Sequence, residues 1–372
     1  MANWRGAALR FCNVAGLPIL EPFVRLAAGE DPKEQFKGVA KFLIVPAVAI
    51  AVFLGAWTAA ARVVVTDSMK LPSPQSTWEA GRDLFVMHQE QKAQDRSRKQ
   101  EKLKEAVTLM ATAKAVEKKA STASDDEKAK LLSTALLYKK RAVTAANFTP
   151  SSAPTFVDQI LTSLKTVFFG FAIATVLAVP IGVLCGMNPW FNAALNPMIQ
   201  IFKPVSPLAW LPLAFLIIVW MYSGPSTEKP LFEKAFLISA ATVSLCSLWP
   251  TLINTTLGVA SVDKDYMNVA KVLKLSWTQQ LFKIVLPASL PLMFAGMRIS
   301  LGVGWMVLIA ADMLAQNPGL GKFVWDEFQN GSSVTYARIA FSVIIIGLIG
   351  LMLDRVMICL RNLVSFGNPA AA

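Results

Sequence analysis

Long apolar runs, separated by shorter polar stretches, dominate the pattern of this chain. A helix needs about 20 mostly apolar residues to cross the hydrocarbon core of a membrane. Six runs come close to that length and are expected to be spans: 42–61, 167–187, 205–222, 235–257, 290–314 and 336–360. The pattern therefore predicts an all-α, polytopic membrane protein. Six spans would place both chain ends on the same side.

Composition supports this interpretation. Of the 372 residues, 54% are hydrophobic and only 16% are charged, whereas soluble domains carry about 25% charged residues. The net charge of +12 would also suit a nucleic-acid-binding protein. Many of the cations flank the apolar runs, however, where they orient a membrane protein. We therefore expect membrane lipid, and no nucleic acid, as a partner.

The distribution of lysine and arginine predicts the orientation. Six of these residues precede the first run, and four (Lys264, Lys271, Lys274 and Lys283) lie between the fourth and fifth. Because basic loops stay in the cytoplasm, both termini and this loop are expected there, in a bacterial inner membrane. Residues 88–149 carry fourteen basic and eight acidic residues. They are nevertheless expected outside, because the rule weakens for long loops.

The 88–149 insert has the local signals of a helical hairpin. Ser124 and Glu127 have the spacing of a capping box. Apolar residues recur at helical spacing on both sides of it, so the two stripes are expected to bury each other. The stripes are Leu103, Val107, Met110 and Lys114, and Leu131, Leu132, Ala135 and Leu136. The insert is either a structural hairpin in a tolerant loop or a docking element for an outer partner.

The predicted organisation has five parts. Residues 1–40 form an N-terminal arm, either an interfacial segment on the cytoplasmic surface or an ordinary packing element. Residues 41–87 hold the first span and an outer turn, and 88–149 the insert. Residues 150–365 form a five-span core, and 366–372 a tail.

Few residues of the chain suit catalysis or metal binding. The single histidine, His88, has no partner nearby in sequence, and the four cysteines lack metal-ligand spacing; they are Cys12, Cys185, Cys246 and Cys359. A phosphate-binding GxxxxGK[ST] loop is missing, because Gly321-Lys322 is followed by Phe323. No catalytic, cofactor-binding or metal-binding residue is therefore predicted.

The most informative segment is 261–287, between the fourth and fifth runs. Asp263 or Asp265 can cap a first short helix. Ser276 and Gln279 form a capping box for a second one, and Pro287 is expected to end or kink it. The sequence thus predicts a short helix between two spans, with a break before the next, a shape suited to docking into a groove on a soluble partner.

This segment resembles the coupling loop of binding-protein-dependent ABC importer permeases. Asn268-Val269-Ala270 stands at the family's E-A-A position, Lys274 where a glycine is usual, and Ile284-Val285-Leu286-Pro287 at its I-x-L-P end. The asparagine and the lysine depart from the general pattern. In both positions the segment resembles the branch of the family that moves nitrate, bicarbonate, cyanate, taurine and alkanesulfonates.

Other stretches resemble the same branch, over roughly residues 155–365 and 40–80. The 249–255 stretch (WPTLINT) is most similar to that of nitrate permeases. The 71–74 (LPSP), 204–212 (PVSPLAWLP), 296–299 (GMRI) and 323–326 (FVWD) stretches also match. The insert is not a feature expected of the family.

The resemblance implies a six-span type I ABC importer fold with the hairpin as an insert. It implies two permease copies, separate ABC ATPase subunits that bind the ATP, and a periplasmic or lipid-anchored substrate-binding protein, working by alternating access. Nitrate or nitrite is the expected cargo; taurine or another sulfonate, bicarbonate, or a different small ligand is the alternative. The residues expected to couple to the ATPase are Asp265, Asn268, Val269, Ala270, Leu273, Lys274, Leu275 and Ser276.

An anion pathway needs hydrogen-bond donors and positive potential. The candidates are Arg298, Ser206, Trp210, Asn254, Thr255 and Thr256. Arg298 has the alternative of snorkelling to the interface or pairing with a carboxylate, and Asp312 suits structural pairing or contact with the binding protein. A gradient-driven transporter or a membrane scaffold would also have six spans. Neither explains the 261–287 segment.

Overall fold

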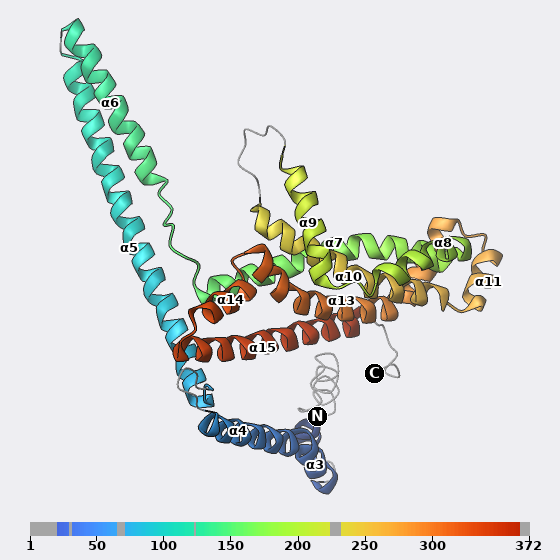
Figure 1. Cartoon of the computed structure of the whole chain (residues 1–372). Helices are drawn as coiled ribbons and strands as arrows, with labels where there is room; N and C mark the ends of the chain where they lie inside the picture. Colours follow the sequence, from blue (N-terminus) through green and yellow to red (C-terminus); the bar gives the residue numbers. More distant parts are fainter. Residues whose placement is uncertain (1–20, 30–31, 65–70, 123, 224–231, 365–372) are drawn as a thin grey trace. The chain divides into compact units, whose positions relative to one another are not determined.

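The computed structural model describes residues 21–29, 32–64, 71–122, 124–223 and 232–364, and every regular element in these ranges is a helix. Gly81–Asp158 forms one compact unit. The rest of the described chain forms the other, which contains the apolar helices (Figure 1).

Five helical stretches are long and apolar enough to cross a membrane. They contain α4 (Val45–Val63), α7 (Phe156–Met187), α10 (Lys234–Ala260), α13 (Leu286–Ala315) and α15 (Ser333–Val364). Each covers one of the predicted runs. The described part of the chain thus confirms an all-α, polytopic architecture.

The remaining run, expected at 205–222, belongs to a bent pair of helices, which is either a broken span or a re-entrant loop. Helix α8 (Pro189–Phe202) and helix α9 (Pro207–Met221) meet at a bend of 105°. Pro204 and Pro207 flank the bend, and proline disfavours helical backbone at the residue before it. The 15 residues of α9 rise only about 22 Å, so α9 needs α8 to complete a span.

Helix α10 lies between α7 and α13 and forms the centre of the core (Figure 1). Glycines bring α7 close to it: a Cβ at Gly170 would meet Ala240 and Val243, and one at Gly186 would meet Thr256 and Val259. Small residues allow such close approach between membrane helices. The residue numbers of the contacting positions increase together on both helices, so α7 and α10 run in the same direction.

Helix α13 runs in the opposite direction to α10. A Cβ at Gly258 would touch Ser289, whereas one at Gly296 would touch Asn254 and the carbonyl of Pro250. The core therefore has two ends. At one, α10 ends and leads into α11 (Lys264–Val272), and we call it the α11 end. At the other, α7 and α10 begin and α13 leads into α14 (Leu320–Asn330); this is the α14 end.

A buried polar cluster closes the α14 end. The carboxylate of Asp312, which is 0% exposed, accepts hydrogen bonds from the Ser163 hydroxyl and the Asn317 amide, each at 2.7 Å. A Cβ at Gly319 would collide with the Asp312 carboxylate, and one at Gly321 with the carbonyl of Ile309. The glycines near Lys322 therefore serve close packing of α14, and Asp312 has the structural role considered for it.

The insert is a long helical hairpin made by α5 (Pro74–Ala120) and α6 (Asp125–Ala146). Its buried seam consists of alanines seven residues apart: Ala106, Ala113 and Ala120 on α5, and Ala135 and Ala142 on α6. Leu109, Val116, Leu131 and Tyr138 alternate with them and are partly buried. Two helices with such a seam form an antiparallel pair with heptad spacing.

The expectation that the leucine stripes bury each other is wrong. Only Ala135 of the stripe residues is fully buried, and Leu131 partly, while Val107 is 66% and Leu136 69% exposed. Alanine occupies the seam, so the larger side chains lie beside it. The Ser124 capping box is also not formed. Ser124 is the N-cap residue of α6 and has extended backbone, but its side chain makes no capping hydrogen bond.

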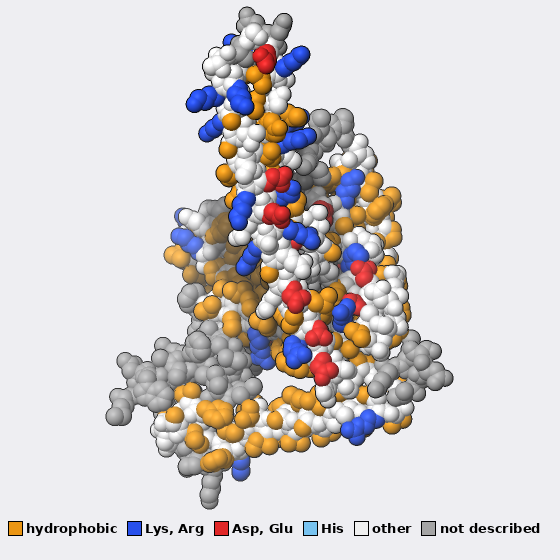
Figure 2. Space-filling view, turned by 90° about the vertical axis from the view of Figure 1, so that its left-hand side faces the viewer, with side chains coloured by type: hydrophobic (Ala, Val, Ile, Leu, Met, Phe, Trp, Pro, Cys, Tyr) orange, Lys and Arg blue, Asp and Glu red, His pale blue; other side chains and the backbone are white. Residues whose placement is uncertain are grey.

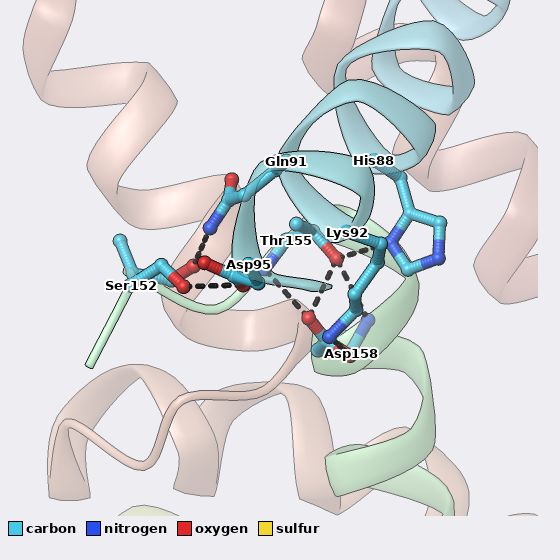
Figure 3. Close-up of polar contacts among 8 residues, drawn as sticks. His88, Gln91, Lys92, Asp95, Ser152, Thr155 and Asp158 are labelled. Atoms are coloured by element: carbon cyan, nitrogen blue, oxygen red, sulfur yellow. Dashed lines mark hydrogen bonds and ion pairs between the residues drawn. The ribbon is translucent and has the colours of Figure 1, made fainter. Parts of the chain in front are cut away.

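The base of the hairpin is held by polar contacts within the same unit (Figure 3). Ser152 donates to Asp95 at 2.6 Å and Gln91 donates to the carbonyl of Ala153 at 2.6 Å. His88, which has no partner nearby in sequence, contacts the hydroxyl of Thr155 at 2.6 Å. The same hydroxyl donates to Asp158 Oδ2 at 2.7 Å, so these contacts connect α5 to the start of α7.

The N-terminal arm is described from residue 21 onward. Helices α2 (Glu21–Ala27) and α3 (Pro32–Val39) lead through a π-helical turn, η1 (Ala40–Ile44), into α4. The most apolar stretch of this first span has no buried residue. The interfacial residues expected before 21 and the tail at 366–372 lie outside the described residues.

Candidate functional site

The 261–287 segment contains two short helices at the α11 end, and local capping defines both. The Asp263 side chain accepts from the backbone N–H of Asp265, which starts α11. Ser276 and Gln279 form the predicted capping box, which starts α12 (Trp277–Gln280). Both helix starts expected from the sequence are confirmed.

Helix α11 ends at a left-handed residue. Lys274 has a φ of 48°; its N–H bonds to the carbonyl of Lys271, and the N–H of Leu275 bonds to the carbonyl of Ala270, both at 3.0 Å. These two bonds make a Schellman motif, in which the left-handed position usually holds glycine. The backbone thus explains why glycine suits this position, and Lys274 adopts the same conformation at a cost of about 1 kcal/mol.

The expected break at Pro287 is wrong. Helix α12 continues through a π-helical turn, η2 (Leu281–Val285), directly into α13, so that Trp277–Ala315 is one helical stretch. Pro287 follows the π-helical turn almost directly, and this turn accommodates the change in backbone register where the proline lacks an N–H. The actual break lies between α11 and α12, at 273–276. A push on α12 would therefore act directly on a membrane helix.

The segment has an anchored side and an exposed side. Val285, buried with Val183 of α7 and Val259 of α10, packs with Met267 and Leu281 and so ties the segment to the core. The other side carries four lysines and exposes five large apolar side chains. These are Tyr266, Val269, Val272, Leu273 and Trp277. Val272 is 81% exposed, which is unusual for a structural residue. This surface has the apolar centre and charged surroundings of a protein interface.

The comparisons with known proteins account for this arrangement. Residues 178–364 match the family described as binding-protein-dependent transport system inner membrane component, and the match contains the whole 261–287 segment. The chain belongs to this family. The permease subunits of such ABC importers have no ATPase of their own, because the ATPase is a separate subunit, and this permease is a multi-pass protein of the inner membrane.

Two curated relatives are informative. The nitrate import permease protein NrtB of Synechococcus elongatus is 34% identical over 207 residues, which cover 56% of this chain and 69% of the relative. The bicarbonate transport system permease protein CmpB of the same species is 37% identical over 205 residues, covering 55% and 68%. These identities place the permease in the nitrate and bicarbonate branch, and they do not separate the two anions.

The residues expected to couple to the ATPase lie together on the 261–287 segment. Asp265, Asn268, Val269, Leu273, Lys274 and Ser276 are exposed, Leu275 is partly buried, and Ala270 is fully buried. Ala270 therefore faces the core and carries the carbonyl of the Schellman motif. The exposed six are available to a partner.

Arg298 is engaged by a carboxylate in this structure. Its Nε and Nη2 donate to the two oxygens of Asp354 on α15, at 2.5 and 2.9 Å. Such a bidentate ion pair is strong and directional, so Arg298 contributes to the packing of α13 against α15. The sequence analysis considered a carboxylate partner for Arg298 but did not identify Asp354. The rarity of ionisable residues within spans was the available signal.

The other pathway candidates lie at two places. Ser206 caps α9 by accepting from the N–H of Leu208, and Trp210 packs on Phe202 at 5.7 Å between ring centroids. Phe202 also stacks on Trp249 of α10. The sequence analysis did not include Trp249 among the pathway candidates. Within the described residues, the buried indole N–H groups of Trp210 and Trp249 have no hydrogen-bond partner.

The α10 candidates are mostly engaged with their own helix. Asn254 donates to the carbonyl of Pro250 and Thr256 to that of Leu252. Thr255 is 0% exposed, and its hydroxyl has no partner among the described residues. In the described part of the chain, no three His, Cys, Asp or Glu side chains gather as they would around a metal ion.

Proposed function

We propose that this permease imports a small inorganic anion, with nitrate as the first candidate, and that a separate ATPase drives it through the 261–287 segment. The observation that carries the mechanism is the continuous helix from α12 into α13. ATP-driven closure of a partner would move the exposed apolar surface, and with it a membrane helix. In this proposal the 261–287 segment and both termini face the cytoplasm. Two permease copies enclose the pathway, which opens alternately to either side of the membrane.

The pathway proposal rests on donors without partners. An unsatisfied buried donor costs about 1–3 kcal/mol, and an indole N–H can only donate. A dehydrated anion is an acceptor that the Trp210 and Trp249 N–H groups could satisfy when the helices move. Thr255 offers a further hydroxyl. Nitrate accepts hydrogen bonds and has no donor of its own, which suits such a lining.

Bicarbonate is the second candidate, and the similarity to the bicarbonate permease favours it. The deciding experiment reconstitutes the permease with its ATPase and its binding protein in lipid and measures ATP hydrolysis with nitrate, bicarbonate, taurine and a neutral heterocycle. Stimulation by nitrate alone supports the proposal. Stimulation by bicarbonate or taurine alone replaces the anion, and failure to assemble with any ATPase contradicts the mechanism.

A residue-level test uses Trp210→Phe, which keeps the ring and removes the donor. We expect nitrate uptake to fall several-fold while assembly is retained. Trp305→Phe is the matched control, because the Trp305 N–H already donates to the carbonyl of Ile346 at 3.0 Å. A loss of uptake in the control alone would contradict the pathway assignment.

A further inference from the structure

The exposed apolar residues of the hairpin occupy fixed positions relative to the alanine seam. Each stands three residues before or one residue after a seam alanine. Leu103 and Val107 flank Ala106 in this way, and Leu132 and Leu136 flank Ala135. Met110 stands three before Ala113, and Val143 one after Ala142. On each helix these positions lie on one side of the seam.

One ion pair shows that the two helices turn these sides the same way. Lys139 Nζ contacts Glu117 Oε1 at 2.5 Å. Glu117 stands three residues before Ala120, and Lys139 three residues before Ala142. In an antiparallel pair, side chains at equivalent flanking positions meet on one side of the hairpin. All six apolar residues therefore belong to this side, which we call the apolar face of the hairpin.

The opposite side differs in kind. Of the large exposed apolar residues described between 103 and 143, only Leu137 stands off the apolar face, two residues after Ala135. Lys104, Lys118 and Lys140 occupy the next position round each helix and border the face. Figure 2 shows hydrophobic side chains along the hairpin with lysines and arginines beside them. Lys114 and the Glu117–Lys139 pair also lie on this side, so the apolar strip is interrupted and bordered by charge, a composition that suits a docking surface.

The course of the chain limits what can dock there. The hairpin returns into α7 at Phe156, and the start of α7 belongs to the α14 end of the core, because Ser163 bonds to Asp312 and to the N–H of Leu320. The ATPase-coupling segment lies at the other end. In the orientation proposed above, the chain connection from the insert into α7 therefore lies on the side from which substrate arrives.

Charge favours one occupant on that side. The 88–149 insert carries fourteen basic and eight acidic residues. A second copy of the same hairpin would bring equal positive charge and be repelled. A partner with an acidic surface around an apolar patch would be attracted and correctly oriented.

We infer that the apolar face of the hairpin binds the substrate-binding protein of this transporter through an acidic, partly apolar surface of that protein. This inference rests on the proposed import function. The alanines fill the space between the two helices. The larger apolar side chains therefore cannot be buried there and stay exposed on the apolar face. The hairpin then recruits the loaded binding protein to the permease.

The test measures the affinity of the transporter's own binding protein for the permease–ATPase complex in lipid nanodiscs. Leu136→Ser is expected to weaken binding about tenfold, as for a central interface residue. The adjacent Leu137→Ser is the matched control and should bind like the wild type. Lys118→Glu should weaken binding and reduce its salt dependence, whereas Lys119→Glu, farther from the face, should have a smaller effect.

Each remaining outcome is decisive. Equal binding by Leu136→Ser and the wild type, or equal loss in Leu137→Ser, overturns the inference. So does a result in which Leu136→Ser changes only association of the complex with phosphatidylglycerol vesicles, since that would identify a lipid surface. Unchanged basal ATP hydrolysis shows that the variants are folded. If the binding protein docks through the face but nitrate does not stimulate hydrolysis, the inference stands and the proposed cargo fails.

Discussion

The hydroxyl of Ser163 donates a hydrogen bond to the carboxylate of Asp312 across 149 positions of sequence, with 2.7 Å between the oxygens. The same hydroxyl accepts from the backbone N–H of Leu320 at 2.8 Å. One small side chain thus joins the start of α7, the end of α13 and the start of α14. The buried carboxylate holds the connection between α13 and α14 in one position.

Ser163→Ala should destabilise the permease. It removes one donor from a fully buried carboxylate and leaves the Leu320 N–H without its acceptor, which together cost about 1–3 kcal/mol. Thermal unfolding of the purified protein checks this. Thr58→Ala is the control, because the Thr58 hydroxyl bonds to the carbonyl of Leu54 in its own helix and, among the described residues, joins no second helix. Equal melting temperatures for the two variants would contradict the role of the cluster.

Two glycines of α13 should respond to alanine in opposite ways. At Gly296 a Cβ would lie 2.5 Å from Asn254 Cβ and 2.9 Å from the carbonyl oxygen of Pro250, so Gly296→Ala should destabilise by about 1–3 kcal/mol. At Gly302 a Cβ would meet nothing within 4 Å, so Gly302→Ala should stabilise the helix by about 0.5–1 kcal/mol. Unfolding in detergent measures both. A shift in the same direction for both variants would show that α10–α13 contact is not the cause.

Lys274→Gly should preserve coupling and relieve strain. Glycine adopts a φ near 48° without a Cβ clash, although it has more freedom to lose on folding, so the net gain is below about 1 kcal/mol. Lys274→Val should uncouple ATP hydrolysis from uptake, because a β-branched residue rarely adopts left-handed backbone. The ratio of anion taken up to ATP hydrolysed is the readout. If valine couples as well as glycine, the Schellman turn is not needed.

Arg298 and Asp354 should behave as a pair. Arg298→Ala leaves a carboxylate without its partner in a membrane helix, and should reduce the yield of folded permease. Asp354→Asn in the same chain should restore much of that yield, since the uncompensated charge is gone. If yield is restored but uptake stays low, Arg298 has a pathway role in addition. Restored yield and uptake together would assign the arginine to structure alone.

Much of this fold follows from the sequence because the membrane imposes a simple rule. Mostly apolar runs of sufficient length are expected to be helices, since a helix satisfies its own backbone groups where lipid offers no partners. The two caps of the 261–287 segment could also be predicted, because Asp263 and Ser276 act on residues two or three positions away. The pattern in the same segment, together with the matching stretches elsewhere in the chain, indicated the family from the sequence, because each motif consists of neighbouring residues.

The tertiary structure decided which side chains meet. Nothing in the local pattern pairs Ser163 with Asp312 or Arg298 with Asp354, because these contacts join helices far apart in the sequence. The hairpin shows the same limit: leucine and alanine recur with the same helical period, so periodicity alone favoured leucine at the seam. Close helix packing admitted alanine instead and left Leu136 exposed. The sequence by itself determined the apolar helices and the two caps of the 261–287 segment, whereas the distances between helices determined the clusters, the seam and the surfaces.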